Sequence, residues 1–201
     1  MDTGCIVLAG GSGLRLGQKK ALETVGKRSL LERVLCRLSF LDSDILLVTT
    51  KELPYPWLSD YPRLRVVSDI YPGNGPLGGI YTGLRFTGSD YSLVVACDMP
   101  FLNQGLLRYM IELSAGFDLV VPRVGELVEP LHGVYSKACL APIECLLEQG
   151  SLGVRELFGM VRVRYAEADE IDRFDPEHLS FFNVNTKSDL AKARGLVGNE
   201  I

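Results

Sequence analysis

One short segment near the start of the chain gathers the residue types that bind phosphate. It runs from Leu8 to Lys20, reads LAGGSGLRLGQKK, and follows an apolar run expected to be the first strand. Glycines allow backbone N–H groups to turn toward an anion without a Cβ in the way. Arg15 offers a planar fork to phosphate oxygens, and Lys20 a mobile point charge. Because no Ser or Thr follows Lys20, the segment is not a GxxxxGK[ST] loop. It predicts a phosphate-binding loop rather than a plain strand-to-helix turn.

An acidic residue ends another apolar run. Asp98 lies in the segment CDMPF, directly after the expected strand 91–96, and Asp69 follows a shorter apolar run. The carboxyl ends of parallel strands meet at one edge of a sheet, where open α/β folds bind ligands. A lone Asp at a strand end is often only a turn residue. Beside a triphosphate site, however, Asp98 is suited to bind Mg²⁺, which takes few protein carboxylates and keeps phosphate oxygens and waters.

A second glycine cluster reads GNGPLGG, from Gly73 to Gly79, and matches the pattern GxGxxG with Asp98 20 residues after Gly78. In a dinucleotide-binding fingerprint the glycines follow the strand at once. Here residues 68–72 intervene, and Pro76 suits the first turn of a helix, so a nicotinamide site is disfavoured. The two stretches hold eight of the 21 glycines, and we expect both to form walls of a nucleotide site.

The elements that would position these residues alternate between short apolar runs and helical patterns, which is typical of βαβ units. Strands are expected at 5–9, 44–49, 64–67, 91–96, 118–122 and 161–165. Helices are expected at 30–38, 77–86, 104–113, 136–147, 151–158 and 187–194, with Ser136 and Ser151 as caps of two of them. The segment 126–135 is expected to be an irregular hairpin on one side of the site.

Length and composition narrow the class of protein. The 201 residues suit one domain spanning 1–201, and 47% hydrophobic with 23% charged residues is ordinary for a soluble globule. A net charge of −4 without a Lys/Arg run gives no support to nucleic-acid binding. Five cysteines without a CxxC pair favour a reducing cytosol over structural zinc. No apolar run reaches 18 residues, so we expect a cytoplasmic protein without a signal peptide or membrane contact.

Five motifs occur together in an order that resembles one family. They are LAGGSGLRLGxxK, Asp69 followed by GxGPLGGI, CDMPF, PLHGVYS and FFNVNT, between Ile6 and about Leu190. As a set they are similar to the MobA-like family of molybdenum cofactor guanylyltransferases. That resemblance implies a three-layer α/β/α Rossmann-like fold with a mainly parallel, mixed sheet. It also implies an enzyme that uses GTP and Mg²⁺ to join GMP to the terminal phosphate of molybdopterin, with release of pyrophosphate.

The resemblance also implies roles for single residues. Those expected to hold the nucleotide are Leu8, Ala9, Gly10, Gly11, Lys20, Asp69 and Asp98. Catalysis would rest on Arg15, Lys20 and Asp98, with Asp98 as the metal ligand, and the pterin substrate would meet His132, Asn183 and Asn185. Proteins that deliver the cofactor or mature molybdoenzymes are the expected transient partners.

The chain departs from the family pattern at two places. Lys19 stands where the family often has Asp, which leaves open whether Lys19 or Lys20 reaches the phosphates. Thr49 and Thr50 stand where the family often has Asn near the base, so guanine specificity is less firmly implied than phosphate binding. The alternatives are cytidylyl transfer to the same cofactor, nucleotidyl transfer to another small phosphate acceptor, and a non-catalytic regulator. The intact Asp98 and Lys20 argue against the regulator.

Overall fold

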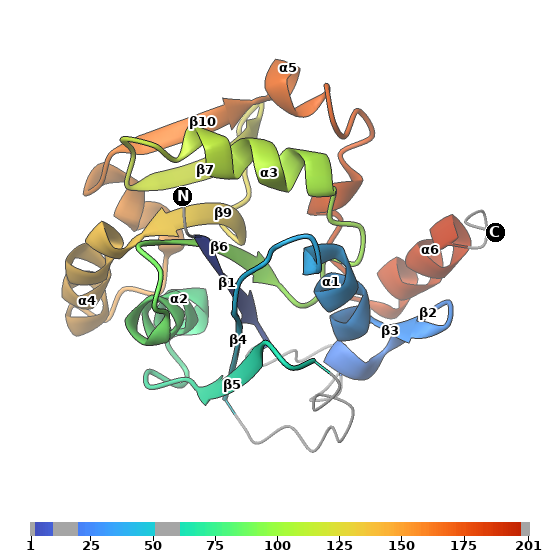
Figure 1. The fold of residues 1–201 in the computed structure, drawn as a ribbon, viewed down its shortest axis with the longest axis horizontal. Coiled ribbons are helices and arrows are strands. Elements are labelled where there is room, and N and C mark those ends of the chain that lie inside the picture. Colours follow the sequence, from blue (N-terminus) through green and yellow to red (C-terminus); the bar gives the residue numbers. More distant parts are fainter. Residues whose placement is uncertain (1–2, 10–19, 51–60, 198–201) are drawn as a thin grey trace.

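A mixed eight-stranded sheet forms the centre of the computed structural model, which describes residues 3–9, 20–50 and 61–197 (Figure 1). The strands are β1 (Thr3–Leu8), β4 (Ile45–Thr49), β5 (Leu64–Ser68), β6 (Tyr91–Ala96), β7 (Leu119–Val124), β8 (Leu127–Val128), β9 (His132–Ser136) and β10 (Val163–Glu167). Their order is β10-β7-β9-β6-β1-β4-β5, and β8 pairs with β7. Neighbours are parallel except that β9 runs antiparallel to β6 and β7, and β8 antiparallel to β7.

Helices cover both faces of the sheet. The α-helices are α1 (Leu30–Leu38), α2 (Gly75–Phe86), α3 (Gln104–Leu113), α4 (Leu140–Glu148), α5 (Ala168–Ile171) and α6 (Lys187–Val197). Short 3-10 helices are η1 (Lys20–Leu22), η3 (Lys137–Cys139), η4 (Val154–Gly159) and η5 (Leu179–Phe181).

Alternate residues of β1 divide the core into two halves. Cys5 and Val7 pack with α1 and α3, whereas Ile6 and Leu8 pack with α2 and α4. Successive side chains of a strand point to opposite faces, so this division shows helices on both sides of the sheet. The expected three-layer α/β/α fold with a mainly parallel, mixed sheet is confirmed.

The segment 126–135 meets its expectation only in part, since β8 pairs antiparallel with β7 in a hairpin. Its second half begins β9, a fully buried strand between β6 and β7, rather than an irregular hairpin beside the site. Gly133 was misleading, because glycine usually weakens a strand. Here a Cβ on Gly133 would lie 2.8 Å from the Val120 carbonyl oxygen, so the close strand requires glycine.

Two further local features differ from expectation. Ser151 does not cap a helix, since η4 begins after Gly153 and the Ser151 hydroxyl accepts a hydrogen bond from the Gly153 amide (3.3 Å). A small hairpin, β2 (Thr24–Val25) and β3 (Arg28–Ser29), precedes α1 and was not foreseen. Gly26 in its two-residue turn has a φ of 65°, which glycine adopts without strain. Ser29 then caps α1 in a capping box with Glu32.

The glycines of α2 have a packing role that the sequence did not reveal. Gly78, Gly79 and Gly83 are buried within the helix, where it lies against the sheet. A Cβ on Gly78 would come within 2.7 Å of the Tyr71 carbonyl oxygen, and one on Gly83 within 2.5 Å of Ile6 Cγ2. These glycines let α2 approach its neighbours closely, which accounts for two of the four glycines of the 73–79 cluster, Gly78 and Gly79, without a ligand.

We expect Gly83→Ala to lower the free energy of unfolding by about 1 to 3 kcal/mol, because overpacking against β1 outweighs the better helix propensity of alanine. Gly195→Ala is the matched control, since Gly195 is also helical but a Cβ there meets no described atom within 4 Å. That control is expected to gain up to about 1 kcal/mol. Urea unfolding of both variants measures the contrast, and equal effects would contradict the packing role.

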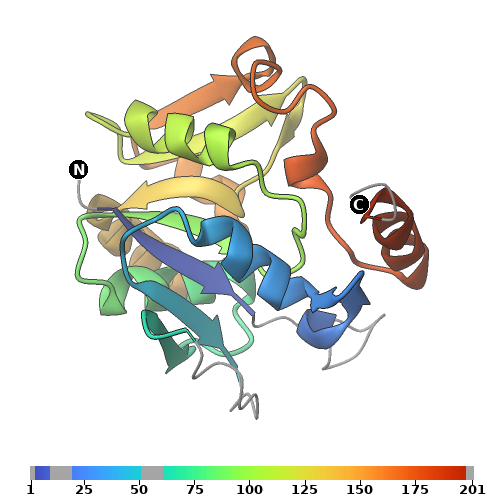
Figure 2. The same cartoon turned by 45° about the vertical axis from the view of Figure 1, so that its right-hand side comes forward.

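The C-terminal helix α6 lies beside the β2–β3 hairpin, away from the sheet (Figure 2). A separate apolar cluster joins them, in which Val25 and Leu30 pack with Val184, Leu190 and Ala193. None of the helices in the described part of the chain is long and apolar enough to cross a membrane.

Candidate functional site

Three polar side chains from distant parts of the chain meet beyond the carboxyl ends of β1 and β6. The Lys20 ammonium donates to Asp98 Oδ2 and to Asn185 Oδ1, the latter at 2.7 Å. Lys20 lies 78 residues before Asp98 and 165 before Asn185, so only the fold brings them together. The side chains of Lys20 and Asp98 are 18% and 15% exposed, which strengthens their attraction relative to a fully solvated pair.

Backbone hydrogen bonds fix Asp98 in place. The Cys97 amide donates to the Leu8 carbonyl (3.1 Å), which continues the β1–β6 pairing, and the Val184 amide donates to the Asp98 carbonyl (3.0 Å). The second bond ties the segment that contains Asn183 and Asn185 to the end of β6. The asparagines are therefore held at the same edge of the sheet as Asp98.

Asp98 also fits the chemistry of a metal ligand. Its Oδ1 atom is buried and has no hydrogen-bond partner among the described residues. The described residues contain no group of three or more His, Cys, Asp or Glu that could hold a metal ion. The unpartnered Oδ1 atom suits Mg²⁺, which is commonly bound by one or two carboxylates together with substrate phosphates. The metal role of Asp98 stays a prediction.

Glu129 joins this site although the sequence analysis did not single it out. Its Oε2 atom accepts from the Asn183 side-chain amide (3.3 Å), and its Oε1 atom accepts from the Leu131 amide (3.1 Å). Burial raises the pKa of Glu129, and the nearby negative charge of Asp98 raises it further. By accepting the hydrogen bond from its side-chain amide, Glu129 orients Asn183. Its position just before the PLHGVYS motif was the available signal.

His132, expected to contact substrate, lies in the buried strand β9. Its side chain is 0% exposed, and the ring packs edge-on against Phe181 with centroids 5.0 Å apart. Neither ring nitrogen has a hydrogen-bond partner among the described residues. Burial lowers the pKa of His132 to about 4. This burial argues against direct contact with a substrate and for a neutral, structural histidine.

We expect His132 to make the protein less stable in mild acid. Above its ordinary pKa of about 6.5 the residue is neutral in both states, and stability does not depend on it. Below that pH the unfolded chain binds a proton that the folded chain resists until about pH 4, so the free energy of unfolding falls. Between pH 7 and pH 5 the free energy of unfolding falls by about 2 kcal/mol for this reason. Urea unfolding at pH 7 and pH 5 measures this loss of stability. The variant His132→Leu should lack the part of the loss that comes from His132. An equal loss in wild type and variant would contradict the prediction.

Asp69 lies at the same edge of the sheet, after β5. Its Oδ1 atom accepts from the Thr82 hydroxyl (2.8 Å) and the Tyr71 amide (2.9 Å), which joins the loop after β5 to α2. The backbone amide of Asp69 donates to the Thr49 carbonyl (2.8 Å). Thr49 is buried, whereas Thr50 is exposed. Of the two threonines, Thr50 is therefore the one available to a base.

The remaining expected nucleotide-binding residues divide between described and undescribed parts of the chain. Leu8 ends β1, and the Ala9 amide that follows donates to the Val48 carbonyl (2.8 Å), so both lie at the edge where Lys20 and Asp98 meet. Gly10, Gly11 and Arg15 lie outside the described residues, as does Lys19.

Comparisons with known proteins show what the chain is similar to. Residues 5–167 match the family model described as the MobA-like NTP transferase domain. The chain is 40% identical over 194 residues to a probable molybdenum cofactor guanylyltransferase of Pelotomaculum thermopropionicum, covering 96% of this chain and 93% of the relative. It is 34% identical over 195 residues to the molybdenum cofactor guanylyltransferase of Desulfosudis oleivorans, with 96% and 94% covered. The crystal structure of molybdopterin-guanine dinucleotide biosynthesis protein A from Archaeoglobus fulgidus superposes with a TM-score of 0.84 at 29% identity, covering 98% and 99% of the two chains.

Proposed function

Because this chain belongs to the MobA-like NTP transferase family, we propose that it is a molybdenum cofactor guanylyltransferase. It would transfer GMP from GTP to molybdenum–molybdopterin and release pyrophosphate. The observation that carries the proposal is the meeting of Lys20, Asp98 and Asn185 at the carboxyl edge of the sheet. Two curated relatives that share nearly the whole chain bear the same activity in their names.

The proposed reaction is an in-line displacement at the α-phosphorus of GTP. A phosphate oxygen of the acceptor forms the new P–O bond, and the bond from the α-phosphorus to the oxygen that bridges to the β-phosphorus breaks. Pyrophosphate leaves with that electron pair, so no protein nucleophile is required. Cys97 is unsuited to be one, because burial of its thiol and the adjacent Asp98 charge raise its pKa to about 12.

Catalysis then rests on positioning and charge, as in phosphoryl transfer generally. The Lys20 ammonium, aimed by Asn185, would bind the phosphates of GTP and stabilise the departing pyrophosphate. Asn183, held by Glu129, would contact the acceptor. Asp98 would hold Mg²⁺ through its buried oxygen, and the bound ion would neutralise charge on the phosphate oxygens.

The other residues of the proposed nucleotide site belong to segments at the same edge of the sheet. We propose that Leu8, Ala9, Gly10 and Gly11 line the nucleotide and that Arg15 forks onto its phosphates. Asp69 would lie near the base and ribose, with the exposed Thr50 in place of the amide usual in the family. The whole chain would act as one catalytic domain in the cytoplasm, and delivery or maturation proteins would exchange the pterin with it.

Pyrophosphate release tests the proposal. The protein is incubated with Mg²⁺ and GTP, CTP or ATP, with and without molybdenum–molybdopterin. We expect rapid release only with GTP and the acceptor together. Faster release with CTP would assign cytidylyl transfer, and release only with a sugar phosphate as acceptor would assign a different nucleotidyltransferase. Nucleotide binding without release under any condition would contradict an enzymatic function.

A further inference from the structure

The two asparagines of the FFNVNT segment have their side-chain amides turned in opposite senses. The carbonyl oxygen Oδ1 of Asn185 accepts from the Lys20 ammonium (2.7 Å), so its NH₂ group points away from that lysine. Asn183 uses its other end, because Nδ2 donates to Glu129 Oε2 (3.3 Å) and to the Phe181 carbonyl (3.2 Å). The neighbouring groups, and not the residue type, therefore decide which end of each amide remains for a ligand.

Two acceptor oxygens fix the orientation of the Asn183 amide. An amide NH₂ group carries two donors, and it meets two oxygens here. The Phe181 carbonyl can only accept, so reversing the amide would bring two acceptor oxygens together. Both donors of Asn183 are thereby engaged, which leaves its carbonyl oxygen Oδ1 as the end available to a ligand.

Glu129 holds the amide from a fixed position. Its second oxygen, Oε1, accepts from the Leu131 amide (3.1 Å). Its backbone amide donates to the Pro122 carbonyl of β7 (3.3 Å), and its backbone carbonyl accepts from the His132 amide of β9 (3.2 Å). The residue is thus tied to two strands of the sheet. A side chain that is held before a ligand arrives loses less conformational entropy when the ligand binds.

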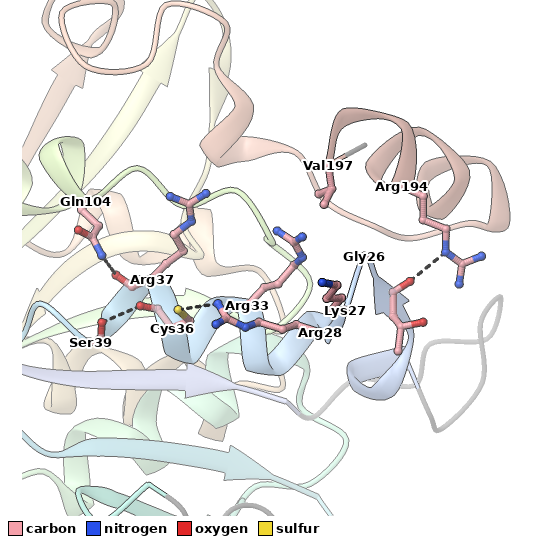
Figure 3. A pocket seen from close by; sticks show the side chains of 11 residues that line it. Gly26, Lys27, Arg28, Arg33, Cys36, Arg37, Ser39, Gln104, Arg194 and Val197 are labelled. Carbon is pink, nitrogen blue, oxygen red and sulfur yellow. Dashed lines mark hydrogen bonds between the residues drawn. The ribbon is translucent and has the colours of Figure 1, made fainter. Parts of the chain in front are cut away.

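Asn183 lies at the carboxyl edge of the sheet, within reach of a ligand. The bond from the Val184 amide to the Asp98 carbonyl anchors its segment there. Val184 is buried, whereas Asn185 is exposed and Asn183 partly exposed, so both asparagines lie on the open side of the segment. A pocket of about 960 Å³ between α1, α6 and the β2–β3 hairpin is lined by neither Asn183 nor Glu129 (Figure 3). A ligand of Asn183 would therefore lie near Asp98 rather than in that pocket.

We propose that Glu129 and Phe181 present Asn183 to the substrate as a hydrogen-bond acceptor, so that its Oδ1 atom recognises an N–H group on the ring of the phosphate acceptor. This inference rests on the proposed function, in which that acceptor carries a pterin. A pterin ring offers N–H donors, whereas ionised phosphate oxygens only accept. Glu129 is then a positioning residue, and Asn183 selects the acceptor by its ring rather than by its phosphate. A site built to bind a donor in this way rejects molecules that lack it.

Side-chain NMR tests this recognition without depending on the reaction. The Asn183 NH₂ signals are identified by their loss in Asn183→Asp. We expect 6-hydroxymethylpterin, which has ring N–H groups and no phosphate, to shift them, and methyl phosphate to leave them unchanged. Glu129→Gln should weaken the pterin titration about tenfold, because glutamine has one oxygen for the two donors that Glu129 accepts. Shifts with methyl phosphate but not with the pterin, or with neither, would overturn the proposal.

Steady-state rates with GTP and molybdenum–molybdopterin test the role of Glu129 in turnover. Glu129→Gln should raise the KM for the pterin acceptor about tenfold and lower kcat by less, with the KM for GTP unchanged. Glu126→Gln is the matched control, because it removes an exposed carboxylate three residues earlier and should behave like the wild type. If Glu129→Gln does not fold, Glu129→Asp withdraws both oxygens by one methylene and should raise the same KM.

The pattern of the kinetic changes separates positioning from other roles. Equal rises of both KM values together with a lower melting temperature would show a merely structural role of Glu129. A lower kcat with an unchanged acceptor KM would place Asn183 at the reacting phosphates or the metal ion. Either result would overturn the proposal. If the wild type releases no pyrophosphate with any acceptor, the proposed function fails, while the NMR titrations still decide whether Asn183 recognises a pterin ring.

Discussion

Asp98→Ala reduces turnover on the order of 10²- to 10³-fold, while GTP still binds, if Asp98 holds the metal ion at the reacting phosphates. The expected loss follows from two properties of the site. The buried Oδ1 atom has no partner among the described residues, and Oδ2 accepts from the Lys20 ammonium. Alanine removes both oxygens but leaves the Asp98 carbonyl that anchors Val184. The fold at the site should therefore persist.

Steady-state pyrophosphate release and calorimetric titration with GTP separate the two effects of this variant. Asp42→Ala is the matched control, since the Asp42 side chain is 91% exposed and pairs only with Arg63 in the described structure. It should turn over like the wild type. Wild-type turnover of Asp98→Ala would remove the metal role, and loss of GTP binding together with a lower melting temperature would indicate a structural role instead.

Features that depend on neighbouring residues could be predicted from the sequence, whereas features that depend on distant residues could not. Local patterns placed β6 and α3 at their observed bounds, because apolar periodicity acts within a few residues. They could not place β9, whose pairing with β6 and β7 depends on distant strands. His132 shows the same limit. The family resemblance implied a substrate contact for this residue, but the burial of β9 is a property of the whole sheet.

The candidate site also combines features that local sequence predicts with features that it does not. Asp98 could be expected at the sheet edge because it directly follows a buried strand, and strand ends meet there. The pairing of Lys20 with Asn185 spans 165 residues, so no local pattern indicates it. Glu129 was missed because its role arises from a contact with Asn183, 54 residues away. The sequence predicts that Gly78 and Gly79 line the nucleotide site, and it does not distinguish the close packing seen in α2 from approach to a ligand.

Lys20→Ala should lower kcat/KM for GTP on the order of 10²-fold or more, because it removes the cation that we propose binds the phosphates of GTP. It also leaves the partly buried Asp98 carboxylate without its ion-pair partner. Lys20→Arg should not restore activity, since a planar guanidinium cannot replace a compact ammonium between Asp98 and Asn185. Initial rates of pyrophosphate release measure both variants.

Lys19→Ala is the decisive comparison, because the sequence alone left two adjacent lysines as candidates for the phosphates. The structure directs Lys20 to Asp98 and Asn185, so Lys20→Ala should cost at least tenfold more activity than Lys19→Ala. The reverse order would assign the phosphate contact to Lys19 and leave Lys20 as a structural partner of Asp98. Equal, large losses would show that the loop uses both charges, and the single-lysine mechanism would then be wrong.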